Sequence, residues 1–138
     1  MKIAIINGPN LNLIGTRETD IYGGETFGHY FNKLRKKYEH IDFDYFQSNV
    51  EGEIINEIQQ AATNMNGIIL NAGAYTHTSI AIGDAVAAIK IPVVEVHISN
   101  IEAREEFRKY SHISAKCSGT IFGFGLKGYE LAVESFLI

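Results

Sequence analysis

Residues 2–7 read KIAIIN, an unbroken apolar run rich in β-branched side chains. A run of this kind is typical of a strand that is covered on both faces, as strands are in parallel sheets. Outward from it, the same composition predicts further strands at residues 41–46, 67–71, 93–97 and 120–122. The first run therefore predicts a buried parallel sheet.

Longer helical patterns separate these strands. Helices are predicted at residues 26–38, 51–65, 78–89, 99–109 and 129–136. Two of them follow capping-box spacings, Ser48 with Glu51 and Ser99 with Glu102. Because strands that alternate with helices form parallel βαβ units, we expect an α/β fold. The expected architecture is a flavodoxin-like open parallel five-stranded sheet of order 2-1-3-4-5, with helices on both faces. No repeat or linker divides the chain, which predicts a single domain over residues 1–138.

The composition argues against several classes of protein. A net charge of -4 gives no broad electrostatic reason to bind nucleic acid. No segment approaches the roughly 20 apolar residues that span a bilayer, and the N-terminal apolar run is too short for a signal peptide. Cys117 is the only cysteine, so a reducing cytoplasm is the simplest setting. The five histidines lack the spacing of metal ligands, so no metal site is expected.

Polar side chains gather at the carboxyl ends of the predicted strands, where open α/β sheets bind ligands. They include Asn10, Asn71, His77, Glu95 and His97. The stretch from Gly8 to Gly24 also calls for a function, because loops above about 12–15 residues are usually functional or disordered. Since it contains Arg17 and Tyr22, we interpret it as a lid over the site.

Several short motifs follow one another along the chain. They are NGPNLNL at residues 7–13 with Gly15, Arg17, Glu18, Tyr22 and Gly23; QSNVEGE at 47–53; NAGAYTHTS at 71–79; EVHISN at 95–100; and Arg104, Arg108, Ser111, Gly123-Phe124-Gly125 and Gly128-Tyr129. In this order, and over nearly the whole chain, they resemble the type II 3-dehydroquinate dehydratases. The chain departs from that pattern at Thr19, where the family usually has proline, and at Val50, where histidine is common.

The resemblance implies a lyase that reversibly dehydrates 3-dehydroquinate to 3-dehydroshikimate through an enolate, without metal or cofactor. Tyr22 matches the base that removes a proton next to the ketone. Since a free tyrosine has a pKa of about 10, a cation is needed to favour the phenolate, and Arg17 matches the lid arginine that supplies it. His97 matches the general acid that protonates the departing hydroxyl, and Glu95 orders its surroundings. Asn10 matches the residue that positions a water to stabilise the enolate oxygen.

The same resemblance implies how the substrate is held. Ile98 and Ser99 would bind its carboxylate through backbone N–H groups at the start of a helix, which is a natural anion site. Asn71 matches the side chain that joins them. His77 and Arg108 match residues that hold the ring hydroxyls.

Assembly and pathway are also implied by the resemblance. Asp84 matches a residue that reaches into a neighbouring subunit's site, so a homo-oligomer is expected, commonly a dodecamer built as a tetramer of trimers. The expected role is in the shikimate pathway of aromatic amino acid biosynthesis or in quinate breakdown, and the residues do not choose between the two.

Each candidate also has an ordinary structural interpretation. Tyr22 alone would usually be a packing residue, His97 a satisfied core histidine, and Asp84 a solvated charge on a helix. Asn10 and Asn71 are common in turns and caps. Two other classes of function stay open on the fold alone: a flavodoxin-like binding or signalling module, and a structural oligomer that has lost turnover.

The spacing Gly123-x-Gly125-x-x-Gly128 imitates a dinucleotide-binding motif between a strand and a helix. Only ten residues follow Gly128, too few for a second βα unit or a ribose-binding acid. We therefore predict that these glycines serve turns and helix packing.

Overall fold

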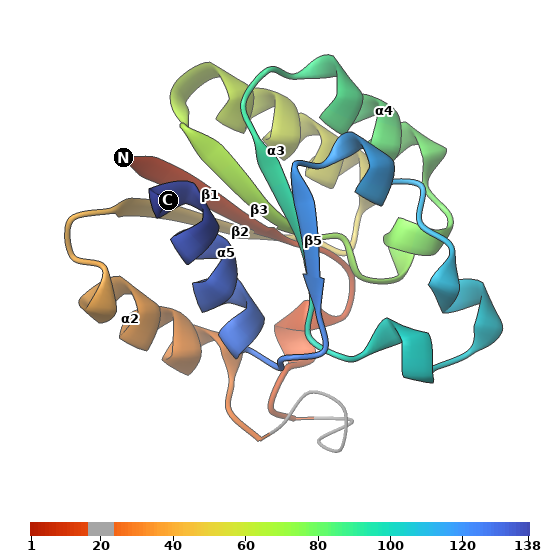
Figure 1. Cartoon of the computed structure of the whole chain (residues 1–138), viewed down its shortest axis with the longest axis horizontal. Coiled ribbons are helices and arrows are strands. Elements are labelled where there is room, and N and C mark those ends of the chain that lie inside the picture. Colours follow the sequence, from red (N-terminus) through yellow and green to blue (C-terminus); the bar gives the residue numbers. More distant parts are fainter. Residues whose placement is uncertain (17–23) are drawn as a thin grey trace.

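The computed structural model describes residues 1–16 and 24–138, and in them a single parallel sheet forms the centre of the molecule (Figure 1). Its strands are β1 (Lys2–Asn7), β2 (Asp42–Gln47), β3 (Gly67–Asn71), β4 (Val93–His97) and β5 (Gly119–Phe122). The strands pair in the order β2-β1-β3-β4-β5, and every pair is parallel. The predicted fold class and strand order are therefore confirmed. Arg17 and Tyr22, the two residues of the predicted lid chemistry, lie outside the described residues.

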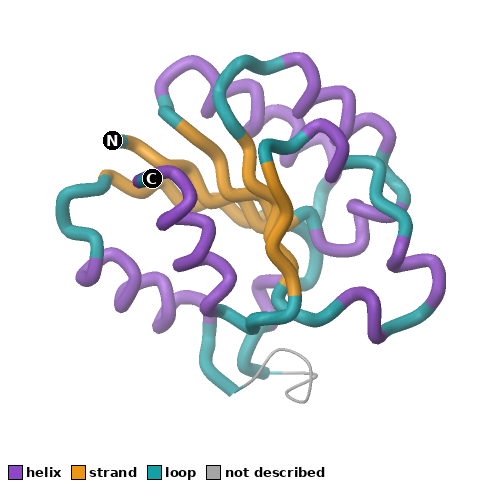
Figure 2. Tube along the Cα trace, viewed as in Figure 1, coloured by secondary structure: helices purple, strands orange, loops and turns teal. Residues whose placement is uncertain are grey.

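Helices cover the sheet on both faces, so that the strands form a middle layer (Figure 2). The helices are α2 (Phe27–Lys37), α3 (Glu51–Asn64), α4 (Ile80–Ala88) and α5 (Lys127–Leu137). One buried cluster joins Ile3 and Ile5 of β1 to α2 and α5, and a second joins Ala4 and Ile6 to α3 and α4. Because neighbouring residues of a strand point to opposite faces, the single run at residues 2–7 supplies both layers of the core.

Local hydrogen bonds fix where the helices begin. The side chain of Thr26 accepts from the backbone N–H of His29 at α2, and that of Ser79 accepts from the N–H of Ile82 at α4. The predicted capping box of Ser48 with Glu51 is wrong. The hydroxyl of Ser48 instead accepts from Val50 N and contacts the carboxylate of Glu53, because α3 begins only at Glu51.

The helix predicted over residues 99–109 is also wrong. Two short 3₁₀ turns, η3 (Ile101–Ala103) and η4 (Glu106–Lys109), replace it, and Arg104 between them has an extended backbone. The side chain of Asn100, not that of Ser99, caps the first turn by accepting from Glu102 N. Local helix propensity therefore does not decide the conformation of this segment.

The glycines of the segment 123–128 have the structural roles that were predicted. Gly123 and Gly125 adopt left-handed backbone angles, with φ of 95° and 63°, in the turn that leads from β5 to α5. A Cβ on Gly128 would stand 3.3 Å from Cγ1 of Val96, so this glycine lets α5 pack closely on β4.

Candidate active site

The carboxyl ends of β1 and β3 approach each other closely. The backbone N–H of Gly8 donates to the carbonyl oxygen of Asn71 at 2.7 Å. A Cβ on Gly8 would lie 2.5 Å from the carbonyl oxygen of Ala72, so no larger residue fits without a backbone shift. Asn10 then turns the chain with a φ of 70°, a conformation that asparagine tolerates better than most residues.

A pocket opens beyond the ends of β1, β3 and β4. It is lined by Pro9, Asn10, Leu11, Leu13, Ile14, Asn71, Gly73, Ala74, His77, His97, Ile98, Ser99, Ile101, Arg104 and Arg108. This is the edge of the sheet at which a parallel α/β fold binds its ligands. Most of the site residues predicted from the sequence therefore share one pocket.

Of the predicted site residues that the structure describes, two do not line this pocket. Glu95 lies behind His97 and is fully buried. Asp84 lies on the outer face of α4, where its side chain is 73% exposed and stands 3.9 Å from the amino group of Lys116. A role of Asp84 in the pocket of its own chain is not compatible with this placement.

His97 is held by a buried carboxylate. Its Nε2 atom contacts Oε2 of Glu95, and the other carboxylate oxygen accepts a hydrogen bond of 2.8 Å from the hydroxyl of Ser114. Burying a carboxylate is costly unless it is paired and hydrogen-bonded, and both conditions are met here. The pair fixes the orientation of the imidazole, which leaves Nδ1 as the nitrogen available to a ligand.

His77 lies beside His97, with ring centroids 6.2 Å apart. Its Nδ1 contacts the carbonyl oxygen of Tyr110 at 2.7 Å, and since a carbonyl only accepts, Nδ1 carries the proton. Burial lowers the pKa of His77 below its usual 6.5, and the nearby His97 and Arg108 add to the effect. The ring is therefore neutral at pH 7 and its Nε2 accepts, which suits the recognition of a hydroxyl group.

Two arginines supply positive charge to the pocket. Arg108 is held by Glu105 through two hydrogen bonds of 3.1 and 3.4 Å, and its guanidinium lies over the ring of Phe107. These bonds use two of the five N–H donors of the guanidinium, so donors remain for a ligand. Arg104 donates to the hydroxyl of Ser99 at 3.3 Å. This edge of the pocket is built to hold oxygen-rich or anionic groups.

The helix N-terminus that was expected at Ile98 and Ser99 is wrong. The turn that follows them spans only Ile101–Ala103 and is capped by Asn100. Both residues still line the pocket, together with Asn71 and the arginines. The observed turn is too short to supply the helix N-terminus on which the expected anion site depended.

Some lining residues carried no predicted role. Leu11, Leu13 and Ile14 form an apolar side of the pocket, and Arg104 forms part of its basic edge. The leucines belong to the same NGPNLNL motif as Asn10, so their alternation with asparagine was the available signal. Ser114 had no signal in the sequence, because its partner Glu95 belongs to a different element.

The described residues show no metal site and no membrane-spanning helix. Within residues 1–16 and 24–138, no three His, Cys, Asp and Glu side chains come together as metal ligands do. None of the helices in the same part of the chain is long and apolar enough to cross a bilayer.

Comparison with known proteins gives the family of this chain. The family model of dehydroquinase class II matches residues 1–137. The chain belongs to this family. Within dehydroquinase class II, it is similar to a 3-dehydroquinate dehydratase of Campylobacter jejuni, 53% identical over 99% of this chain and 87% of that protein. A 3-dehydroquinate dehydratase of Prochlorococcus marinus is 52% identical over 99% of this chain and 95% of that protein.

Solved dehydroquinase structures have the same fold. The type II dehydroquinase of Butyrivibrio crossotus superimposes with a TM-score of 0.96 and 48% identity, covering 100% of this chain and 98% of that one. That of Propionibacterium acnes gives a TM-score of 0.93 and 42% identity, covering 98% and 94%. The resemblance drawn from the sequence motifs is confirmed at the level of the family, the fold and an enzymatic activity.

Proposed function

We propose that this chain reversibly dehydrates 3-dehydroquinate to 3-dehydroshikimate through an enolate. A base removes a proton from the carbon next to the ketone, and the electron pair moves onto the carbonyl oxygen. The enolate then collapses, the carbon–oxygen bond to the departing hydroxyl breaks, and an acid protonates the hydroxyl to give water. The observation that carries the proposal is that the motif residues of β1, β3 and β4 share one pocket in a chain of this family.

His97 is the proposed acid. Its support is the buried Glu95, whose negative charge stabilises an imidazolium that is about to give up a proton. Glu95 itself acts as a positioning residue, since His97 separates it from the pocket. Nδ1 of His97 is the atom from which the proton would pass to the hydroxyl.

Tyr22 is the proposed base, with Arg17 as the cation that favours its phenolate. Both lie outside the described residues, so this assignment rests on the match of the motif at residues 7–23 to the family. Asn10, which lines the pocket, is proposed to position a water against the enolate oxygen. The proton that Tyr22 removes must return to His97 through solvent to complete the cycle.

The substrate's carboxylate is proposed to bind between Ile98, Ser99 and the side chain of Asn71. His77 and Arg108 are proposed to hold the ring hydroxyls. A neutral His77 accepts a hydrogen bond at Nε2, so it can bind the O–H of a hydroxyl group. Arg108 only donates, so it can bind the oxygen of a hydroxyl group. This division of roles fits a polyhydroxylated ring better than a flat apolar ligand.

Assembly belongs to the same proposal. Asp84 faces away from its own pocket, and Ile80 on the same exposed face of α4 is 62% exposed. Both side chains are therefore accessible to another copy of the chain, and the interface itself is proposed from the match of Asp84 to the family. We propose that Asp84 completes a neighbouring site in a dodecamer made of four trimers, in a reducing cytoplasm, and that no metal or cofactor is needed.

The proposal is tested by following the ultraviolet absorbance of the conjugated enone product during incubation with 3-dehydroquinate. We expect turnover that resists both EDTA and borohydride, because neither a metal nor a lysine Schiff base takes part. Absence of turnover in the intact oligomer would overturn the function. A protein that loses activity in EDTA and regains it with a metal ion would overturn the proposed mechanism.

Two variants test the parts of the proposal separately. Tyr22→Phe should lower kcat by about 10²–10⁴-fold, the usual range for loss of a general base. Wild-type kcat in this variant would remove Tyr22 from the mechanism. Asp84→Ala should weaken the assembly or raise KM, as measured by sedimentation velocity and steady-state kinetics. An unchanged oligomer with an unchanged KM would show that Asp84 has no role between subunits.

A further inference from the structure

A chain of hydrogen bonds lies behind Asn71, on the side away from the pocket. Nδ2 of Asn71 donates to the phenol oxygen of Tyr129 at 2.9 Å, and that phenol donates to Oδ1 of Asn7 at 2.7 Å. Nδ2 of Asn7 in turn lies 3.4 Å from the hydroxyl of Tyr45. The three central residues are almost completely buried: Asn7 and Tyr129 are 0% exposed and Asn71 is 2% exposed.

The direction of every bond in this chain is set by one backbone group. The N–H of Gly73 donates to Oδ1 of Asn71 at 3.1 Å, and a backbone N–H cannot accept. Oδ1 of Asn71 must therefore face Gly73, which turns Nδ2 towards Tyr129. Since the phenol oxygen accepts from Nδ2, its single proton is free for Asn7. The orientation of the Asn71 amide thus follows from an unambiguous donor.

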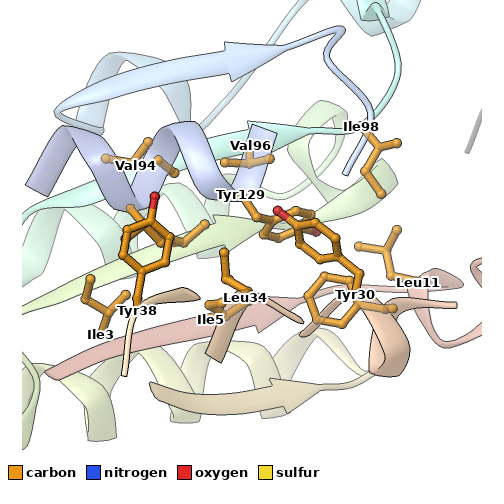
Figure 3. Close-up of a cluster of buried hydrophobic side chains, with 14 of the residues drawn as sticks. Ile3, Ile5, Leu11, Tyr30, Leu34, Tyr38, Val94, Val96, Ile98 and Tyr129 are labelled. Carbon is orange, nitrogen blue, oxygen red and sulfur yellow. The ribbon is translucent and has the colours of Figure 1, made fainter. Parts of the chain in front are cut away.

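Packing and burial keep the Tyr129 phenol in place and protonated. Its ring is packed against Phe27 at a centroid distance of 5.0 Å, within the core between α2, α5 and the sheet (Figure 3). Burial raises the pKa of Tyr129 above its usual 10, so the phenol stays protonated and can both donate and accept. Leaving a buried amide or phenol unpaired is costly, and the chain leaves none of the three central groups unpaired.

The amide of Asn71 has one N–H beyond the one that Tyr129 uses. Because Asn71 also lines the pocket, that second N–H is the group that it can offer to a ligand. An amide flipped by half a turn would offer its carbonyl oxygen instead, which would repel a carboxylate. The orientation of the amide is therefore held at both of its atoms, by the N–H of Gly73 at Oδ1 and by Tyr129 at Nδ2, and Asn7 in turn orients the Tyr129 phenol.

We propose that Tyr129 and Asn7 are positioning residues that lock the Asn71 amide as a hydrogen-bond donor towards the anionic group of the ligand. The inference rests on the proposed function, in which that anionic group is the carboxylate of the substrate. It goes beyond the assignment of Asn71 itself, because it places a determinant of carboxylate recognition on α5, inside the hydrophobic core.

The test compares Tyr129→Phe with Tyr30→Phe. Both variants remove one hydroxyl from neighbouring rings of the same core, with centroids 6.2 Å apart, but only the first removes a member of the chain of hydrogen bonds. Tyr129→Phe should raise KM for 3-dehydroquinate and Kd for 3-dehydroshikimate by about tenfold, in line with losing the alignment of one bond to a charged group. Its kcat should stay close to that of the wild type, and Tyr30→Phe should leave both constants unchanged.

A double-mutant cycle separates positioning from general damage to the fold. In an Asn71→Ala background, Tyr129→Phe should change Kd by less than about twofold, because the amide that it positions is gone. An equal loss of affinity in both backgrounds, or wild-type affinity in Tyr129→Phe alone, would overturn the inference. Should Tyr129→Phe fail to fold, Asn7→Ala takes its place in the same cycle, since it removes the acceptor for the phenol proton.

A third readout stays decisive if the proposed function fails. Absence of turnover in the wild type would overturn the function alone, and the Asn71 side chain can then be followed by NMR in the ligand-free protein. Its two amide proton signals, assigned by their loss in Asn71→Ala, should move in Tyr129→Phe and stay in place in Tyr30→Phe. If the chemical shifts of these two protons are the same in Tyr129→Phe as in the wild type, the inference is overturned irrespective of activity.

Discussion

Two residues of the pocket are held from behind by different kinds of group. His97 is held by a buried carboxylate, whereas Asn71 is held by a neutral phenol and, through it, by a second amide. Glu95 is paired with His97 and with the hydroxyl of Ser114. The support of Asn71 contains no charged group at all. Both supports are buried, and neither Glu95 nor Tyr129 lines the pocket itself.

The difference between the two supports matches the work that each pocket residue is proposed to do. A carboxylate stabilises positive charge, so it suits an imidazole that gains and loses a proton during turnover. A neutral chain of bonds has a fixed direction, so it suits an amide that must present the same atom to every ligand. We therefore expect damage to the charged support to lower kcat, and damage to the neutral support to weaken binding.

The largest effect is expected from Glu95→Gln, which keeps the size of the side chain and removes its charge. kcat should fall on the order of a hundredfold, the upper end of losses seen when such supporting partners are removed. Kd for 3-dehydroshikimate, measured by calorimetry, should change much less. A variant with normal kcat and weakened binding would reverse the roles assigned to the two supports.

A smaller effect, on stability, is expected from Gly8→Ala. The added methyl group would meet the carbonyl oxygen of Ala72 at 2.5 Å and push apart the strand ends that carry Asn7 and Asn71. The free energy of unfolding should fall by about 1–3 kcal/mol, as for other overpacked sites, and denaturant titration measures it. Gly52→Ala is the matched control, because no atom lies within 4 Å of its added Cβ, and it should not destabilise the protein.

Ser114→Ala should lower kcat by about tenfold, because it removes one hydrogen bond to a buried charge and leaves the carboxylate with its histidine partner. Ser114→Thr restores the hydroxyl and should recover most of the rate in the same steady-state assay. If the threonine variant is as slow as the alanine variant, the hydroxyl is not what matters at this position.

The smallest effect concerns the pH dependence of stability. Because burial lowers the pKa of His77 below 6.5, the unfolded chain binds a proton more readily than the folded one. The contribution of the neutral ring is complete above about pH 6.5 and is lost as the pH falls from there through the lowered pKa. His77→Gln should flatten this decline in denaturant titrations at several pH values, while the exposed His40→Gln should keep the wild-type slope.

The fold was largely predictable because its signals are local. Apolar runs such as residues 2–7 mark buried strands, and their alternation with helices leaves few possible topologies. In the segment 99–109 an extended Arg104 separates two short turns, and the capping-box spacing of Ser99 and Glu102 does not reveal this break. The capping-box spacing at Ser48 failed because the carboxylate that its hydroxyl contacts is that of Glu53 and not that of Glu51.

The pocket was predictable only in part. Asn71, His77 and His97 end neighbouring strands or begin the loops after them, so the direction of the sheet alone brings them together. The support behind Asn71 was not predictable, because Tyr129 is 58 residues from Asn71 and 122 residues from Asn7. Gly128-Tyr129 belongs to the motifs that resemble the family, but the local sequence gives this tyrosine no role beyond that of an apolar helix face.

Tyr129 contributes both to the packing of the core and to the hydrogen bonds behind the pocket. Its ring fills space between α2, α5 and β4, while its oxygen belongs to the chain of bonds that ends at the pocket. Redesigns that replace this ring with hydrocarbon of equal volume would leave the buried amides of Asn7 and Asn71 without their phenol partner and weaken ligand recognition in the same step. Engineering of this part of the core therefore calls for screening by affinity as well as by temperature.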